Sequence, residues 1–427
     1  MLAWALWDTG SAGLSAIVVT FVFSVYLTST VGKGLPGGAP PASWLGRALG
    51  VAGLTIAVLA PLIGVWVEYP HRRRTALTVL TGLAVALTSA MSLIRDRPEY
   101  LWPGLALFAA AAACGDLASV PYNAMLRQLS TPEKSGRISG FGLAAAFVGS
   151  VMLLLVVYFG FISGKGATRG LLHLSAGDGM NVRLAMLLAA GWFAVFALPL
   201  LLTAHRLPSA GEVAGPERGL LGGYRKLWTE LAAEWRRDRN LVYFVLASAV
   251  FRDGLAGVFT FGGVLGVNAY GISPANVLIF GAAASVVAAV GAVVGGLVDD
   301  RIGSKPTIVV SLASIIALGL TLVALSGPRA FWLCGLLLCL FIGPAQASAR
   351  TLLIRMSRPG KEGVAFGLYT MTGRAVSFVA PWLFSVFVDV FGAVRAGMGG
   401  LCLVMGAGLL GMLMVRAPRR TVTADVG

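Results

Sequence analysis

The sequence predicts an all-α integral membrane protein with twelve transmembrane helices arranged as two six-helix bundles. Of its 427 residues, 57% are hydrophobic and only 12% are charged, about half of the roughly 25% charge that is usual in soluble domains. The chain offers about a dozen apolar runs of about twenty residues, and each is long enough to cross a bilayer core of roughly 30 Å as a helix. Closed barrels are the other structure that satisfies the backbone in lipid, but their strands are about half as long.

The twelve spans are expected at 4–31, 45–67, 75–94, 101–124, 138–162, 183–204, 240–266, 276–298, 306–326, 329–349, 364–389 and 394–415. The first apolar run begins almost at Met1 and continues for nearly thirty residues. The apolar core of a signal peptide has only about 7–15 residues. We therefore expect the first run to be a membrane span and not a cleaved signal peptide.

A long polar segment separates the sixth span from the seventh. We expect an N-terminal six-helix bundle at 1–204, a cytoplasmic linker at 205–239 and a C-terminal six-helix bundle at 240–427. In the second half of the linker, Leu231 and Trp235 share a helical face with Leu227 or Trp228, and Arg and Lys occupy the other faces. This pattern is typical of a helix lying on the inner leaflet, with an ordinary soluble linker helix as the alternative.

The basic residues predict the orientation. Of the 33 Lys and Arg residues, 22 fall at joints on one side of the membrane, 9 fall on the other side, and Arg252 and Arg374 lie inside spans. By the positive-inside rule the first side is cytoplasmic, together with both termini. We expect a multi-pass protein of the cell membrane, most simply the bacterial plasma or inner membrane. The net charge of +15 lies in short clusters, which suit anionic lipid headgroups and not nucleic acid.

The residues that build metal sites and enzyme sites are poorly represented. The four cysteines lie inside apolar runs without CxxC spacing, and the three histidines fall near loops. We therefore expect no metal and no cofactor. The sequence contains no HExxH, GxSxG or P-loop motif, so we do not expect an enzyme or an ATP-driven pump.

An internal repeat follows the second and the eighth spans. The first copy reads Gly64-Val-Trp-Val-Glu68-Tyr-Pro-His-Arg72-Arg73, and the second reads Gly296-Leu-Val-Asp-Asp300-Arg301-Ile-Gly303-Ser-Lys305. Each copy has a glycine, an acid four residues later, and bases eight or nine residues after the glycine. Two related halves are the construction of many secondary transporters.

The second copy resembles the loop signature of the major facilitator superfamily, Gly-x-x-x-Asp-Arg-x-Gly-x-Lys. The first copy departs from it at Glu68, Tyr69 and His71. Further stretches resemble, in order and over nearly the whole chain, the vacuole-effluxer-like branch of that superfamily. They are Trp4 to Asp8, Val19 to Tyr26, Tyr122-Asn123, Gly136 to Gly140, Asp253-Gly254, Gln346 to Arg350, Gly367 to Tyr369 and Gly373-Arg374.

This resemblance implies the major facilitator fold and an alternating-access transporter. Fungal members of the branch export amino acids from the vacuole. The first, fourth, seventh and tenth spans of that fold line a central cavity, and the second, fifth, eighth and eleventh lie behind them. The present chain departs from the branch at Thr9 and Gly13, where a larger or aromatic residue is usual.

Charged residues inside the spans indicate the transport site. A charge at the bilayer centre costs about 2.5–3.5 kcal/mol or more, so it normally faces a cavity or a partner. The five charged residues inside the spans all fall on spans that line the cavity or lie directly behind it. Together with the amides of Asn123 and Gln346 they form the candidate substrate-binding or coupling set. The set is Asp8, Asp116, Asn123, Arg252, Asp253, Gln346 and Arg374.

We expect different roles for these charges. Arg374 lies about ten residues into its span, near the midplane, and a guanidinium there requires an anion. That anion is either a carboxylate of the protein, such as Asp253, or the carboxylate of the substrate. Asp116 or Asp253 is the expected proton carrier, because burial favours the neutral form of a carboxyl group. Asp8 is either a structural residue of the inner gate or a proton site.

The repeat is expected to form a cytoplasmic gate, because an acid at a helix end can bind bases or a helix N-terminus across the bundle. The gate set comprises Gly64, Glu68, Arg72, Arg73, Gly296, Asp300, Arg301, Gly303 and Lys305. The alternative is that these residues only anchor the topology.

The function predicted from these features is a proton-coupled secondary transporter of a small polar solute, such as an amino acid or a similar zwitterion. Charges of both signs in the cavity suit such a solute. Two alternatives stay open. Wide apolar walls favour an exporter of drug-like or lipid-like amphiphiles, and a membrane receptor or scaffold that transports nothing belongs to a different class.

Overall fold

The structure is a computed structural model that describes residues 1–32, 41–68, 70–131, 133–164, 168–203, 239–272 and 274–416, together with Arg225 and Thr229. The linker predicted at 205–239, with its interfacial helix, lies outside the described residues apart from Arg225, Thr229 and Arg239. Within the described part of the chain, twelve helices are long and apolar enough to cross a membrane. This agrees with the predicted all-α membrane fold.

The first six spans contain the following helices. The first span is built from α1 (Leu2–Ser15), the π-helix η1 (Ala16–Phe21), α2 (Phe23–Tyr26) and the π-helix η2 (Leu27–Val31). The next spans are α3 (Pro41–Trp66), α4 (Pro70–Ala90), α5 (Leu101–Ala124), α7 (Ser135–Val157) with η5 (Tyr158–Ile162), and α8 (Met180–Thr203). Shorter elements join them: η3 (Met91–Leu93), η4 (Pro98–Tyr100), α6 (Leu126–Leu129), β1 (Thr168–Arg169), β2 (Leu174–Ser175) and η6 (Gly177–Gly179).

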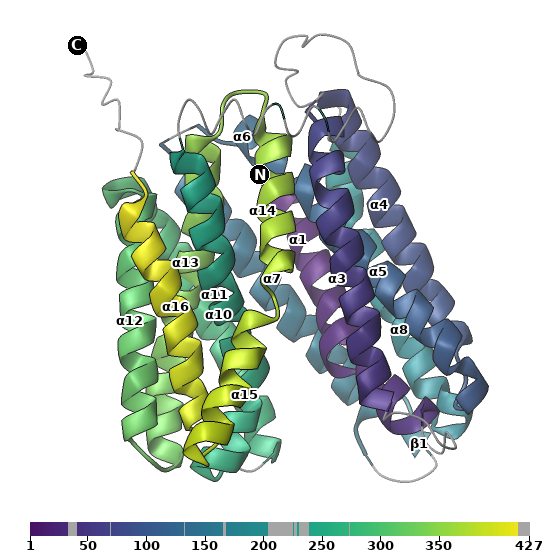
Figure 1. The fold of residues 1–427 in the computed structure, drawn as a ribbon. Helices are drawn as coiled ribbons and strands as arrows, with labels where there is room; N and C mark the ends of the chain where they lie inside the picture. The colour runs from purple at the N-terminus through teal and green to yellow at the C-terminus, as the bar shows by residue number, and fades with distance from the viewer. Residues whose placement is uncertain are drawn as a thin grey trace.

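The last six spans are α10 (Asn240–Tyr270), α11 (Pro274–Ile302), α12 (Ser304–Ala324), α13 (Pro328–Met356), α14 (Glu362–Ala375) with α15 (Val379–Phe391), and α16 (Ala396–Met414). In Figure 1 the first six spans lie on the right and the last six on the left. We call the two groups the N-half and the C-half. The top of that view carries α6 and the joints of the two repeat copies, and we call it the basic end; β1 lies at the opposite end.

The core of the N-half is an aromatic stack. The ring of Tyr122 on α5 lies between those of Trp4 and Trp7 on α1, with centroids 4.6 and 4.3 Å apart. The indole nitrogen of Trp4 donates to the carbonyl of Tyr122 at 3.1 Å, and that of Trp7 donates to the hydroxyl of Thr81 on α4 at 3.1 Å. Tryptophan is accepted at depth here because each buried N–H has an acceptor.

The two halves cross at glycines. Gly64 on α3 packs on α14, where a Cβ in its place would lie 2.5 Å from the carbonyl oxygen of Gly363. Gly140 on α7 packs on α11, and its Cβ would lie 2.3 Å from the carbonyl oxygen of Ala292. Both distances are far below a van der Waals contact. Close helix contacts of this kind are what small residues supply in membranes.

Two span boundaries differ from the prediction. The tenth span continues to Met356 rather than ending at 349, because Arg350 and Arg355 have acidic partners inside the protein. The eleventh span is interrupted at residues 376–378, between α14 and α15. The interruption lies just before Ala380-Pro381, whereas Gly343-Pro344 falls inside the uninterrupted helix α13.

Candidate functional site

An ion pair between the two halves occupies the middle of the spans. Arg374 lies in the last turn of α14 and Asp116 lies on α5. The pair forms between Nη2 of Arg374 and Oδ2 of Asp116, and the two side chains are 39% and 36% exposed. The charges are therefore in contact with each other and still accessible to a solute.

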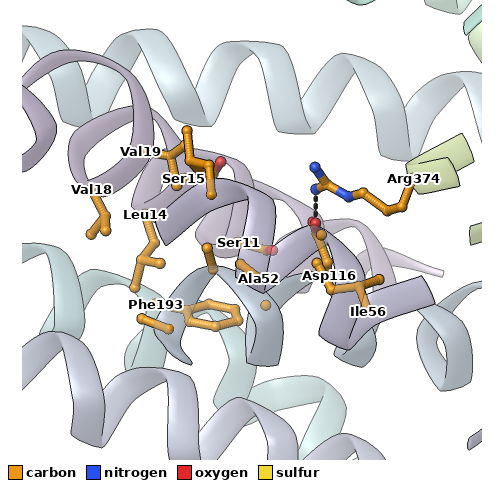
Figure 2. Close-up of a pocket in the computed structure, with 15 residues that line it drawn as sticks. Ser11, Leu14, Ser15, Val18, Val19, Ala52, Ile56, Asp116, Phe193 and Arg374 are labelled. Atoms are coloured by element: carbon orange, nitrogen blue, oxygen red, sulfur yellow. Dashed lines mark ion pairs between the residues drawn. The ribbon is translucent and has the colours of Figure 1, made fainter. Parts of the chain in front are cut away.

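The pair borders a cavity (Figure 2). Small and apolar side chains of α1, η1, α3, α5 and α8 form most of its wall, and two hydroxyl groups face it. The lining residues are Ser11, Leu14, Ser15, Val18, Val19, Leu49, Ala52, Gly53, Ile56, Ala111, Ala112, Gly115, Asp116, Phe193 and Arg374. Figure 2 shows the charged pair on one side of the cavity and Val18 and Val19 on the other.

Sequence reasoning missed Ser11 and Ser15. They are four residues apart on the first span, so they share one helix face. Asp8, three residues before Ser11, was recognised. A search for polar residues on its face would have found both serines. The cavity thus offers a guanidinium, a carboxylate and two hydroxyls against an apolar wall, which suits a small solute carrying an anionic group.

Asp253, one of the anions considered for Arg374, does not bind it in this structure. Oδ2 of Asp253 accepts a hydrogen bond from the backbone N–H of Ala380 at 2.7 Å. The break in the eleventh span leaves this N–H without a helical partner, since the first amides of every helix are unpaired. Asp116 takes the place expected for Asp253, and Asp253 is buried at 6% exposure.

Arg252 binds the eleventh span as well. Its Nη1 donates to the carbonyl of Tyr369 at 3.1 Å, and its guanidinium lies 3.7 Å from the centroid of the Tyr369 ring. Neither Arg252 nor Asp253 is among the residues that line the cavity. Both charges of the seventh span therefore contact protein groups of α14 and α15.

Asp8 lies closer to the basic end than the cavity. Nη1 of Arg350 on α13 contacts its Oδ2 at 3.2 Å, and the two side chains are 17% and 13% exposed. The pair joins the first span to the tenth and hence the N-half to the C-half. The two amides of the candidate set lie on α5 and α13: Asn123 donates to the carbonyl of Ser119 at 2.8 Å, and Gln346 is half-buried one turn before Arg350.

The first repeat copy bonds to the start of α14. Oε1 of Glu68 accepts from Nζ of Lys361 at 3.0 Å. Nη2 of Arg73 contacts Oε2 of Glu362 at 2.8 Å, with both side chains 3% exposed. Arg127, which follows α5, donates to the other oxygen of Glu362 at 3.2 Å. The first copy was a weak match to the family signature, yet it supplies both an acid and a base to this contact between halves.

Arg72 has a different position in the same copy. Its guanidinium lies 5.8 Å from the centroid of the Trp66 ring, at the end of α3. The cation–π contact is therefore within the N-half, and Arg73 is the base of this copy that reaches the C-half.

The second copy bonds to the start of α7. Asp300 accepts from the backbone N–H groups of Gly136 and Arg137 at 2.9 and 3.1 Å, and from Nε of Arg137 at 3.0 Å. Nη2 of Arg355 also contacts it at 3.3 Å. An acid at the N-terminus of α7 is stabilised by the helix dipole as well as by these donors. The preceding Asp299 accepts from Arg355 and from the hydroxyl of Ser304.

Lys305 of the second copy bonds within the C-half. Nζ of Lys305 donates to the carbonyls of Leu413 and Val415 at 3.1 and 2.6 Å, at the end of α16. Gly303 has φ of +98° and is the N-cap of α12, and Arg301 lies in the last turn of α11. Asp300 connects this copy to the N-half, whereas Lys305 and Gly303 shape the joint between α11 and α12.

The sequence missed the partners of the repeat. Arg355, Lys361 and Arg127 were used there only to orient the chain, Arg137 entered besides only as part of the stretch Gly136 to Gly140, and Asp299 and Glu362 were not singled out. Their signal was their position at the ends of spans that cross at glycines. Together these residues close the basic end, where four sets of ion pairs connect the halves. They involve Asp8, Glu68, Glu362 and Asp300.

Comparison with known proteins identifies a family that matches most of the chain. The family described as vacuole effluxer Atg22 like matches residues 42–425. YxiO of Bacillus subtilis, an MFS-type transporter, is 21% identical over 422 residues, which cover 99% of this chain and 95% of YxiO. Autophagy-related protein 22-1 of Neosartorya fischeri is 22% identical over 307 residues, covering 67% of this chain and 49% of that protein. The chain thus spans about half the length of this fungal relative.

Solved structures show the same fold. The fucose:proton symporter FucP of E. coli, in its outward conformation, superposes with a TM-score of 0.71 at 15% identity and covers 98% of each chain. At this identity the likeness establishes the fold alone. The family match spans most of the chain, and the twelve spans and paired repeat copies agree with it. The chain belongs to the vacuole effluxer Atg22-like family, and it is a membrane transporter of the major facilitator type.

Proposed function

We propose that this chain is an alternating-access secondary transporter of a small solute with an anionic group, such as an amino acid or a similar zwitterion. The observation that carries the proposal is the ion pair of Arg374 and Asp116 at the edge of the cavity. Amino-acid efflux is the activity that the resemblance implies for the fungal branch, and the matching family is described as effluxers of the vacuole.

The pair supplies a physical mechanism for coupling. A guanidinium stays charged at this depth and binds a carboxylate through a planar fork. A substrate carboxylate and Asp116 therefore compete for Arg374. When a proton neutralises Asp116, the competing anion is lost and Arg374 becomes available to the substrate. Binding of a proton then favours binding of the solute, which is thermodynamic coupling between two sites. Asp116 is in this scheme the proton carrier.

The closed basic end supports an assignment of the conformational state in the transport cycle. By the positive-inside rule this end faces the cytoplasm, so the structure corresponds to the outward-facing state. The ion pairs of Asp8, Glu68, Glu362 and Asp300 then form the cytoplasmic gate. Opening that gate requires all four to separate. Binding energy from the solute in the cavity would offset part of the cost, as alternating access requires. Residence in a bacterial plasma membrane, with both termini inside, belongs to the same proposal.

Counterflow in proteoliposomes tests the function. Purified protein is reconstituted with one unlabelled amino acid inside, and uptake of its labelled form is measured across a panel of amino acids, peptides and sugars. We expect uptake of at least one zwitterion, abolished in Arg374→Ala. A second candidate, an exporter of apolar amphiphiles, is favoured by the apolar wall of the cavity. Uptake of amphiphilic dyes that persists in Arg374→Ala would select it. Substrate binding without flux would select the receptor class.

A further inference from the structure

The eleventh span is broken into two helices that pack against different halves of the protein. Helix α14 crosses to the N-half: Gly367 and Gly363 lie against the backbone of Ala60 and Gly64 on α3. Helix α15 packs within the C-half, where the rings of Phe384 and Phe261 on α10 stack at 3.9 Å. Arg374 is in the last turn of α14, directly before the break. Its position in the cavity therefore depends on the angle between the two helices.

Two adjacent residues of the seventh span hold the two sides of this break. The Arg252 guanidinium reaches the last turns of α14, at the carbonyl of Tyr369 and next to Gly373, where a Cβ would lie 3.3 Å from Nη1. The Asp253 carboxylate reaches the first turn of α15, at the N–H of Ala380. Consecutive residues of a helix point about 100° apart, which is why neighbours in sequence can contact opposite sides of one break.

The signs of the two charges match the helix dipoles. A cation is stabilised at the C-terminal end of a helix and an anion at the N-terminal end. Arg252 is at the C-terminal end of α14, and Asp253 is at the N-terminal end of α15. The carboxylate also satisfies an amide that the break leaves unpaired, which is costly to leave bare inside a membrane. Reversing the order of the two residues would place each charge at the wrong end.

We propose that Arg252 and Asp253 are positioning residues that fix the angle of the break in the eleventh span and thereby hold Arg374 at the cavity. The break at residues 376–378 is then the hinge that moves when the gate opens. The assignment deepens the proposed function, on which the role of Arg374 rests. It differs from a coupling role for Asp253, because the carboxylate acts through its bond to Ala380 and need not change protonation during transport.

Spin-label distances test the hinge without reference to transport. Nitroxides are placed at Thr370→Cys on α14 and Ser385→Cys on α15, in a full-length chain whose native cysteines are replaced by alanine, reconstituted in lipid nanodiscs. With Asp253 present we expect one narrow distance distribution. Asp253→Val removes the acceptor and should at least double its width. Asp253→Asn keeps an acceptor oxygen of the same shape and should leave the width unchanged. An unchanged distribution in Asp253→Val overturns the proposal.

Arg252→Met keeps the test decisive if Asp253→Val does not fold, since it removes the donor at the other side of the break. It should broaden the same distribution, and a narrow distribution in a folded Arg252→Met protein also overturns the proposal. Flux supplies the second readout: Asp253→Asn should retain proton-driven accumulation within about twofold of the unmutated chain. Complete loss of proton-driven accumulation in Asp253→Asn, with counterflow intact, would identify Asp253 as a proton carrier and overturn its positioning role.

The proposed transport function and the positioning role of Arg252 and Asp253 can each be refuted without refuting the other. The distance measurement depends only on the break, so it stands even if this chain transports no zwitterion. Arg374→Ala in the doubly labelled chain is the matched control, because Arg374 lies beside the break but takes no part in holding it. We expect its distribution to stay narrow while its counterflow is lost. A distribution as broad as that of Asp253→Val would show that the Arg374 ion pair, and not the seventh span, fixes the angle.

Discussion

Oε2 of Glu362, the first residue of α14, lies 2.8 Å from Nη2 of Arg73 at the start of α4. At the equivalent joint of the other half, Oδ2 of Asp300 lies 3.0 Å from Nε of Arg137. Each bond connects the N-half to the C-half, and each lies beside a crossing of glycines. The Arg73–Glu362 pair is buried, with both side chains 3% exposed, whereas Arg137 is 55% exposed. Removing one partner of the buried pair would leave an uncompensated charge, at a cost of about 3–5 kcal/mol.

Asp300→Asn should slow transport while leaving substrate affinity and expression nearly unchanged. The amide cannot hold the N-terminus of α7 and two guanidiniums as a carboxylate does, so the state with a closed basic end becomes less populated. Turnover and Kd are measured separately, by counterflow and by equilibrium binding. Asp389→Asn is the control, since Asp389 is an exposed carboxylate on α15. Equal turnover in the two variants would show that the joint containing Asp300 only fixes the membrane topology and does not act as a gate.

Gly140→Ala should open the basic end. Its added methyl group would meet the carbonyl oxygen of Ala292 at 2.3 Å, and overpacking of this kind costs about 1–3 kcal/mol. A cysteine at Ser357, which is 5% exposed in the closed state, should then react faster with a membrane-impermeant maleimide in inside-out vesicles. Gly82→Ala is the matched control, because a Cβ there meets nothing within 4 Å. Equal labelling rates in both variants would contradict the closed-gate assignment.

Arg374→Lys should lose substrate affinity by about tenfold or more. Lysine keeps the charge but lacks the planar fork, and a hydrogen bond to a charged group contributes about 1.5–3 kcal/mol.

The double variant Arg374→Ala with Asp116→Ala should fold better than Arg374→Ala alone, since no carboxylate is left without its partner, and should still not transport. Thermal unfolding and counterflow measure the two effects. Wild-type flux in Arg374→Ala would remove this residue from the mechanism.

Asp116→Asn should separate exchange from accumulation. An amide cannot carry a proton, so uptake driven by a pH gradient should be lost while counterflow of substrate persists. The measurement compares uptake in proteoliposomes with and without an imposed pH gradient, and with a protonophore that collapses it. If flux of the unmutated chain ignores the collapsed gradient, transport is not coupled to protons and Asp116 serves binding only.

Cysteine labelling tests the orientation. In intact cells, a membrane-impermeant reagent should miss a cysteine at Glu217 in the linker and modify one at Lys165 or Gly271 on the opposite side. The physical reason is the excess of basic residues at the linker side. Permeabilised cells provide the control, because all three positions should then react. The reverse pattern in intact cells would invert the topology and exchange the assigned outward and inward states.

The sequence alone was sufficient for the number and the order of the spans. An apolar run of about twenty residues must be helical in lipid whatever its neighbours are, so this property is local. The repeat copies were also visible, since glycine, acid and base recur at fixed spacing. Asp116 and Arg374 were identified separately for the same kind of reason: a charge inside a span is costly unless the protein provides a partner or a cavity.

The tertiary structure decided which charges meet. Arg374 pairs with Asp116 and not with Asp253, because the outcome depends on how each helix is rotated about its axis and on a break that frees the N–H of Ala380. Helices that are apolar on all faces carry little periodicity to fix that rotation. The partners of Glu68 and Asp300 lie in the opposite half, more than 160 residues away in sequence. Such contacts exist only once the two halves are packed together, which no local pattern encodes.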